Sequence, residues 1–398
     1  MQPAAQYAAV TGAYWAFTLS DGALRMLVLL HLHATGRSPL ELLWALLPYE
    51  LAGVVTNLLG GFLGARLGVR ATLVAGLLLQ LGCCLALAGS GAQPALALVM
   101  ASQLVSGVAK DLAKTGAKSS VKALAPAGDH GALFRLVALL TGSKNALKGL
   151  GFFLGGALLA ALDFRGALAC LAVVLALAAL LAAWSLPAAP GRSKQAPSIA
   201  SLFAHDRWLN ALAAARLFLF GSRDAWFAIA LPLFLVSEAG WSAPGVSAFL
   251  AAWVIGYGIV QALAPRFARP VDVAAGGRAV VGWTLAAALP LLAAAFLLAG
   301  GAAPGPVLVA TLLAYGIVFA IDSSLHSWLV VARGGEDAAL RVGFYYAANA
   351  AGRVAGLAAS ATLYAAWGAG RPGMVACLLG SAAAVALAAL CSLPLRRA

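Results

Sequence analysis

Apolar runs long enough to cross a bilayer recur along almost the whole chain, and they restrict its fold more than any other feature. A helix needs about 20 predominantly apolar residues to cross the hydrocarbon core, and only helices and closed barrels satisfy their backbone hydrogen bonds there. The 398 residues are 63% hydrophobic and only 10% charged, whereas a soluble domain usually carries about 25% charged residues. The pattern predicts an all-α membrane protein.

Twelve transmembrane helices are predicted, in two groups of six around a polar segment. The first group is 7–31, 39–62, 71–90, 95–116, 131–160 and 166–186, and the second is 208–237, 243–264, 279–299, 306–331, 343–367 and 372–393. This layout predicts two six-helix bundles, over 1–186 and 208–398, joined by a cytoplasmic linker over 187–207. Two such halves are typical of transporters built from repeats.

Glycine and proline predict details inside these spans. The pairs Gly60/Gly64, Gly151/Gly155 and Gly352/Gly356 form GxxxG motifs, which allow two helix backbones to approach closely. Pro48 and Pro232 fall inside spans and predict bends, because proline cannot donate a backbone hydrogen bond.

Lys and Arg are distributed unevenly between the loops on the two sides of the membrane. All but three of the loop Lys and Arg residues fall in one set of loops, the exceptions being Arg37, Arg165 and Arg371. Cytoplasmic loops carry the excess of positive charge, so the rich set and both termini are predicted to be cytoplasmic. The net charge of +13 is then explained by topology, and no nucleic-acid partner is predicted.

Ionisable residues inside the spans indicate function. A charge at the bilayer centre costs about 2.5–3.5 kcal/mol on insertion scales, so it usually faces a polar cavity or a partner. The spans carry five acidic residues, Asp21, Glu50, Asp111, Asp224 and Asp322, against nine cations, Arg25, Lys110, Lys114, Arg135, Lys144, Lys148, Arg216, Arg223 and Arg353. The excess of cations predicts a cavity that holds an anion.

These charges follow a period of three spans. Spans 3, 6, 9 and 12 contain none of these charged residues. Spans 1, 4, 7 and 10 carry most of them, and spans 2, 5 and 11 carry the rest. Nested three-helix repeats would produce this period. Every third helix is therefore predicted to face lipid, and the charged helices are predicted to enclose one central cavity.

Six cations are candidates for substrate binding: Arg25, Lys110, Lys144, Lys148, Arg223 and Arg353. Lys144 and Lys148 are one helical turn apart and share a face. Arg223 and Asp224 are adjacent, so their side chains are expected to point about 100° apart and not to pair. For each cation, structural pairing with a carboxylate is the alternative. Four aromatic residues are candidates for lining the cavity, with packing or anchoring at the membrane interface as the alternative: Trp253, Tyr257, Tyr345 and Tyr346.

Six further residues are candidates for proton coupling or for charge pairing: Asp21, Glu50, Asp111, Asp224, Asp322 and His326. Burial and neighbouring charges both change the protonation of a carboxyl group. Asp322 has His326 one turn away and no cation in its own span, which favours it for a proton relay, with a structural pair as the alternative. No metal site and no cofactor are predicted. No HExxH motif and no loop long enough for a catalytic domain is present, so an enzyme is not expected.

Several segments resemble a known transporter family. The segment GFLGARLGVR (61–70) resembles the loop signature of the major facilitator superfamily, with Ala65 in place of the usual acidic residue. Four stretches resemble more closely the organoarsenical efflux permeases of bacterial arsenic-resistance operons, the ArsJ family. They are DGALRMLVLLHLH (21–33), TGSKNALKGLGFFLGG (141–156), RLFLFGSRDAWF (216–227) and WVIGYGIVQALAP (253–265).

The resemblance implies the major facilitator fold and a monomer in the bacterial inner membrane. It also implies export of 1-arseno-3-phosphoglycerate by alternating access, coupled to protons, which would confer arsenate resistance. A partner glyceraldehyde-3-phosphate dehydrogenase would make this ester from arsenate in the cytosol. No binding residue is carried over from the family. The residues by themselves indicate only an anion transporter, so an antiporter for phosphate, sugar phosphates or another organic anion stays open as the alternative.

Overall fold

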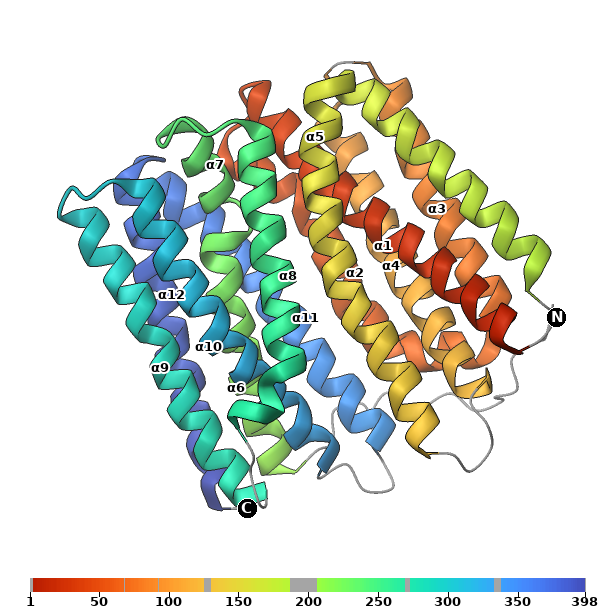
Figure 1. Ribbon diagram of the computed structural model, residues 1–398. Coiled ribbons are helices and arrows are strands. Elements are labelled where there is room, and N and C mark those ends of the chain that lie inside the picture. Colours follow the sequence, from red (N-terminus) through yellow and green to blue (C-terminus); the bar gives the residue numbers. More distant parts are fainter. Residues whose placement is uncertain are drawn as a thin grey trace.

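The computed structural model describes residues 3–67, 69–91, 93–124, 130–186, 206–268, 273–332 and 338–397. All regular structure in these ranges is helical (Figure 1). The first five helices are α1 (Pro3–Ala34), α2 (Pro39–Leu67), α3 (Val69–Gly89), α4 (Leu96–Leu124) and α5 (His130–Ser185). They are followed by α6 (Arg207–Phe227), α7 (Ala230–Ser237), α8 (Ala243–Phe267), α9 (Val273–Ala299), α10 (Pro304–Ala332), α11 (Ala338–Ala366), α12 (Arg371–Ser392) and the 3-10 helix η2 (Leu393–Arg397).

The predicted all-α membrane fold is confirmed. Eight segments of the described chain are long and apolar enough to cross a membrane. The helices α1, α2 and α11 are not among these eight, although each has at least 29 residues. Each of the three contributes charged side chains to the interior, which lowers its apolar character. The predicted linker up to residue 205 lies outside the described residues, and Arg207 already begins α6, so the domain boundaries stay a prediction.

Two predicted spans are joined in the single element α5. Asp163 interrupts it with φ 61° and ψ −175°, which is a backbone conformation that L-residues rarely adopt. The carboxylate of Asp163 accepts a hydrogen bond from the backbone N–H of Gly166 at 2.9 Å, as an N-cap does for the first turn of a new helix. The chain therefore reverses at Asp163, close to the predicted boundary between the spans 131–160 and 166–186.

The predicted span 208–237 is divided into α6 and α7. Pro232 lies in the first turn of α7, and its ring is incompatible with a helical carbonyl four residues earlier, at Ala228. The hydroxyl of Ser360 on α11 accepts the N–H groups of Ile229 at 3.2 Å and Ala230 at 3.0 Å. The helix is thus broken where a bend was predicted at Pro232. The Ser360 hydroxyl accepts the two N–H groups that the break leaves without a helical carbonyl. Pro48 lies inside α2, which continues through it.

The helices pack in two groups that meet along two pairs. In the first group α1 packs on α5, and α4 packs on both α2 and α3. In the second group α6 packs on α11 and α12, and α9 packs on α10 and α12. The two groups meet where α5 lies against α8, visible in the middle of Figure 1, and where α2 lies against α11. The interface between the groups therefore contains helices from both halves of the sequence.

Large apolar side chains cover the outer helices. They include Trp184 in the last part of α5, which is 87% exposed, and Leu289 and Phe296 on α9, which are 68% and 71% exposed. Among the eight apolar segments of the described chain, the one formed by α6 and α7 is the most enclosed, with 83% of its most apolar part buried, compared with 39–44% for the other seven. The exposed side chains agree with spans 6 and 9 facing lipid, and this burial agrees with span 7 lying at the centre. The burial of spans 3, 4, 10 and 12 is equal, so it does not separate the predicted central helices from the predicted lipid-facing ones.

Glycines bring α1 and α5 into backbone contact. A Cβ atom on Gly151 would meet the backbone oxygen of Leu19, and one on Gly155 would meet that of Ala23. The pair predicted at Gly151 and Gly155 therefore does permit close packing, and the pair Gly352/Gly356 packs likewise against α6. The side chains around Gly60/Gly64 lie outside the described residues.

Gly155→Ala is expected to destabilise the protein by about 1–3 kcal/mol, because an added methyl group in a packed contact forces the helices apart. The matched control is Gly12→Ala on α1, where a Cβ would meet nothing within 4 Å. This control is expected to be neutral or stabilising by about 0.5–1 kcal/mol, since alanine favours a helix over glycine. Thermal unfolding of the purified protein in detergent measures both. Equal unfolding temperatures for the two variants would contradict the close contact between α1 and α5.

Candidate functional site

A network of ion pairs lies where the two helix groups meet. Glu50 on α2 pairs with Arg25 on α1 and, at 2.6 Å, with Nη2 of Arg353 on α11. Nε of Arg353 also lies 3.1 Å from a carboxylate oxygen of Asp224 on α6. Asp224 in turn lies 2.5 Å from Nη2 of Arg223. Five charged groups from four helices thus form one connected network.

The carboxylates of this network are more deeply buried than its arginines. The side chains of Glu50 and Asp224 are 2% and 4% exposed, whereas those of Arg25, Arg223 and Arg353 are 12%, 15% and 17% exposed. Removing one partner of a buried ion pair leaves an uncompensated charge. The two carboxylates therefore hold the arginines in place while the guanidinium groups keep access to the space in front of them.

That space is a pocket between α1, α5, α6, α7, α8 and α11, with a volume of about 700 Å³ that includes its open mouth. The four cations Arg25, Lys148, Arg223 and Arg353 line it, together with Asp224, Asn145 and Tyr257. Its other lining residues are apolar: Met26, Leu29, Phe152, Phe227, Ala228, Pro232, Leu250, Trp253 and Val254. A concave site with an apolar lining and a few convergent polar groups is the usual form of a small-molecule site.

Lys148 differs from the three arginines in its partners. Its ammonium group makes no hydrogen bond or ion pair with any residue that the structure describes, and it lies 5.6 Å from the centroid of the Phe152 ring. An ammonium ion held in a membrane interior without a direct hydrogen bond or ion pair is unfavourable. Lys148 is therefore the cation most available to a bound anion.

The expectation that Arg223 and Asp224 do not pair was wrong. Nε of Arg223 donates to Oδ1 of Asp224 at 2.6 Å, although the two residues are adjacent in the sequence. Consecutive Cα–Cβ bonds of a helix do diverge, but the long arginine side chain folds back over its neighbour. Arg223 reaches the pocket while it is anchored, so its charge is partly neutralised.

Two other candidate cations lie away from the pocket lining. The ammonium group of Lys110 lies 4.0 Å from the centroid of the Tyr49 ring, and Tyr49 donates from its hydroxyl to Asp21 at 2.8 Å. Arg25 pairs with Glu50, and not with Asp21 one turn earlier. Lys144 is also not among the residues that line the pocket. The structure thus brings together four of the six candidate cations.

The other acidic candidates lie in two separate clusters. Asp111 accepts from Lys114 at 2.6 Å and from the hydroxyl of Thr56, within the first helix group. Asp322 on α10 accepts from the Thr284 hydroxyl at 2.7 Å, and its second oxygen lies 3.7 Å from Nε2 of His326. Both Asp322 and His326 are fully buried, and neither lines the pocket.

A hydrogen-bonded chain extends from the pocket toward α10. The Tyr257 hydroxyl lies 3.2 Å from the hydroxyl of Ser323, the residue next to Asp322. Arg216 donates to the same hydroxyl at 3.0 Å and to the amide oxygen of Asn349 at 3.0 Å. The buried Asp322–His326 pair is therefore adjacent in sequence to a polar path that begins at the pocket.

Sequence reasoning missed Asn145, Phe152 and Phe227 as pocket residues. A usable signal was present, because Lys148 and Phe152, and likewise Arg223 and Phe227, are four residues apart. Residues at this spacing lie one above the other on a helix face. A cation on the inward face therefore predicts that the aromatic residue one turn later also points inward.

Glu50→Gln is expected to lower the free energy of unfolding by about 3–5 kcal/mol, because it leaves two buried guanidinium groups sharing less negative charge. The matched control is Glu41→Gln on the same helix, whose pair with Arg37 is about one third exposed on both sides. Exposed pairs contribute little, so this control is expected to unfold like the unaltered protein. Denaturation followed by circular dichroism makes the comparison. Similar effects of the two substitutions would show that Glu50 does not hold the network together.

A family model described as the Major Facilitator Superfamily matches residues 10–329. The matched region covers most of the chain and contains Arg25, Glu50, Lys148 and Arg223, and it ends before Arg353. A comparison with curated proteins gives no match.

Proposed function

Because the chain belongs to the major facilitator superfamily, whose members are transporters, we propose that it exports an organic anion by alternating access. The observation that carries this proposal is the group of four cations from both helix groups that line one pocket, one of them, Lys148, with no hydrogen bond or ion pair to a described residue. A multi-pass membrane protein has little reason to keep such charge in its interior unless a ligand balances it.

The net charge of the site supports an anionic cargo. Three arginines share two carboxylates, which leaves one positive charge, and Lys148 adds a second. Guanidinium groups bind carboxylate, phosphate and related oxyanions through two parallel N–H donors. The pocket therefore offers an anion both forked donors and a point charge.

The ion pairs suggest how binding would be coupled to movement. Arg353 connects α11 to Glu50 on α2, so part of the contact between the two helix groups is ionic. An anion in the pocket would compete with Glu50 and Asp224 for Arg353 and weaken that contact. A ligand shifts a conformational equilibrium only if it interacts more favourably with one conformation than with the other. Rocking of one half against the other would then carry the anion across.

The finer proposal, that the cargo is 1-arseno-3-phosphoglycerate, rests on the resemblance to the organoarsenical efflux permeases. Its support here is positional, because all four stretches that carry the resemblance contribute pocket residues: Arg25, Lys148, Arg223 and Trp253. We place the protein, as a monomer, in the bacterial inner membrane with both termini in the cytoplasm, next to a dehydrogenase that supplies the ester. Asp322 and His326 are the proposed residues of proton coupling. The alternative cargo is phosphate or a sugar phosphate.

Lys148→Met is expected to reduce transport at least tenfold, because it removes the pocket cation that makes no ion pair with a described residue and keeps an apolar side chain. Uptake into everted membrane vesicles, corrected for the amount of inserted protein, gives the rate. Arg37→Gln, which removes a charge from an exposed pair, is the control and is expected to transport normally. Normal transport by Lys148→Met would place the anion elsewhere.

Expression in an arsenic-sensitive cell is expected to raise arsenate tolerance only when a glyceraldehyde-3-phosphate dehydrogenase that forms the ester is co-expressed. The physical reason is that the exporter needs the ester and not free arsenate. Growth at increasing arsenate with each protein alone and with both together makes the test. Protection without the dehydrogenase, or none with it, would contradict this cargo. Uptake of phosphate esters in the same vesicles would then favour the alternative.

A further inference from the structure

The pocket has a second wall that the anion proposal does not use. The rings of Phe152, Phe227, Trp253 and Tyr257 also line the pocket, and the ring centroids of Phe152 and Phe227 are 6.3 Å apart. The ring centroids of Phe227 and Trp253 are 5.1 Å apart, and those of Trp253 and Tyr257 are 5.9 Å apart with planes only 2° from parallel. These spacings are typical of interacting aromatic pairs, so the four rings form a connected aromatic wall.

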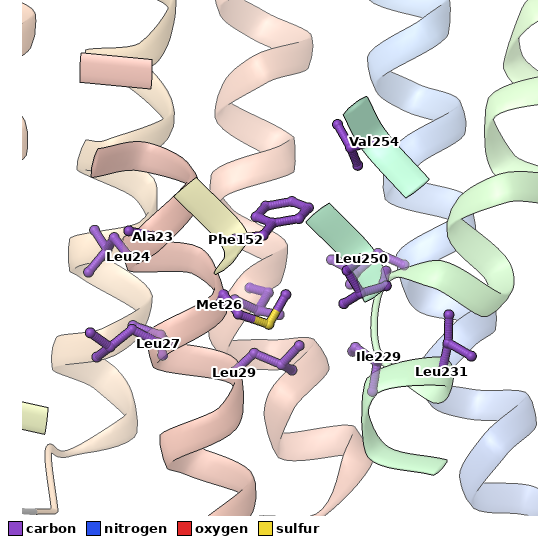
Figure 2. Packing of buried hydrophobic residues seen from close by; sticks show 14 of the residues in the cluster. Ala23, Leu24, Met26, Leu27, Leu29, Phe152, Ile229, Leu231, Leu250 and Val254 are labelled. Carbon is purple, nitrogen blue, oxygen red and sulfur yellow. The ribbon is translucent and has the colours of Figure 1, made fainter. Parts of the chain in front are cut away.

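Aliphatic side chains extend this wall from both helix groups. Figure 2 shows Met26 and Leu29 of α1 and the Phe152 ring of α5 facing toward Leu250 and Val254 of α8. All five of these residues line the pocket. The indole N–H of Trp253 donates to the backbone oxygen of Leu312 at 2.7 Å and is therefore not available to a ligand. Trp253 therefore presents an apolar surface to the space, and the wall offers few hydrogen bonds to a ligand.

A compact polyanion would leave most of this wall without a complementary partner. Charged oxygens gain nothing from apolar surface, and removing them from water costs free energy. A ligand with an aromatic body would instead bury apolar area at about 25 cal/mol per Å². The net charge of two that the four cations and two carboxylates leave also matches a ligand with one or two acid groups.

We infer that this pocket also takes aromatic carboxylates, with the acid group at Lys148 and the neighbouring arginines and the ring against Phe152, Phe227 and Trp253. The inference rests on the proposed function, because it assumes that anions bind in this pocket. It adds a second class of cargo, defined by an apolar ring as well as by charge.

Binding to the purified full-length protein in detergent tests the inference, with 2-naphthoate as the aromatic anion and 3-phosphoglycerate as the compact one. Calorimetry gives both affinities for the unaltered protein and for Phe227→Leu, which keeps an apolar side chain but removes the ring. Loss of one aromatic contact is worth about 0.5–1.5 kcal/mol, so 2-naphthoate is expected to bind about two- to twelvefold more weakly. The affinity for 3-phosphoglycerate is expected to change less than twofold.

Three controls separate the aromatic wall from the exposed apolar surface and from the charge of the site. Phe296→Leu removes a ring that is 71% exposed on α9, and it is expected to leave the 2-naphthoate affinity unchanged. Lys148→Met is expected to weaken both anions, and uncharged 2-naphthylmethanol is expected to bind at least tenfold more weakly than 2-naphthoate. If Phe227→Leu does not fold, Phe152→Leu makes the same comparison on α5.

The outcomes distinguish the inference from the proposal beneath it. Binding of 3-phosphoglycerate without binding of 2-naphthoate would overturn the second class of cargo and leave anion transport intact. Binding of 2-naphthoate that neither Phe227→Leu nor Phe152→Leu weakens would also overturn it. If neither anion binds and Lys148→Met transports normally, the proposed function itself fails.

Discussion

The sharing of one carboxylate, Glu50, by Arg25 and Arg353 is the interaction on which the rest of this structure depends. The pair of Glu50 with Arg353 joins residues that are 303 positions apart in the sequence, and it connects α2 to α11. Without it, two guanidinium groups would lie together in a membrane interior, where like charges repel and desolvation is costly. The single carboxylate makes their proximity possible and still leaves positive charge for a ligand.

Charged and aromatic side chains occur together in the pocket because they are one helical turn apart on the same helix faces. Lys148 and Phe152 lie on one face of α5, and Arg223 and Phe227 lie on one face of α6 across the pocket lining. In each pair the residue nearer the N-terminus is the cation and the one a turn later is the ring. On both helices, therefore, the pocket-lining cation is followed one turn later by a pocket-lining ring.

The fold could be predicted from the sequence to a large extent, because bilayer thickness fixes the length of each apolar run and Pro232 fixes the break between α6 and α7. The meeting of Arg25, Lys148, Arg223 and Arg353 in one pocket also agrees with the excess of cations in the spans. The ion pairs could not be predicted. The pairing of Arg223 with Asp224 depends on a side-chain conformation, and the choice of Glu50 by Arg25 depends on how α1 is rotated against α2. In the sequence, Lys110 and Lys148 are equally good candidates for anion binding. Only the structure shows that Lys110 lies over the Tyr49 ring, away from the pocket lining.

The break between α6 and α7 lies beside the pocket and is held differently from the rest of the span. Two backbone N–H groups there are held by one side-chain hydroxyl, that of Ser360, and not by the carbonyls of a continuous helix. The eight residues of α7 make a rod about 12 Å long at 1.5 Å per residue. Ala228 before the break and Pro232 after it both line the pocket. The joint of the seventh span therefore lies at the pocket itself, and its two free N–H groups depend on the hydroxyl of another helix, α11.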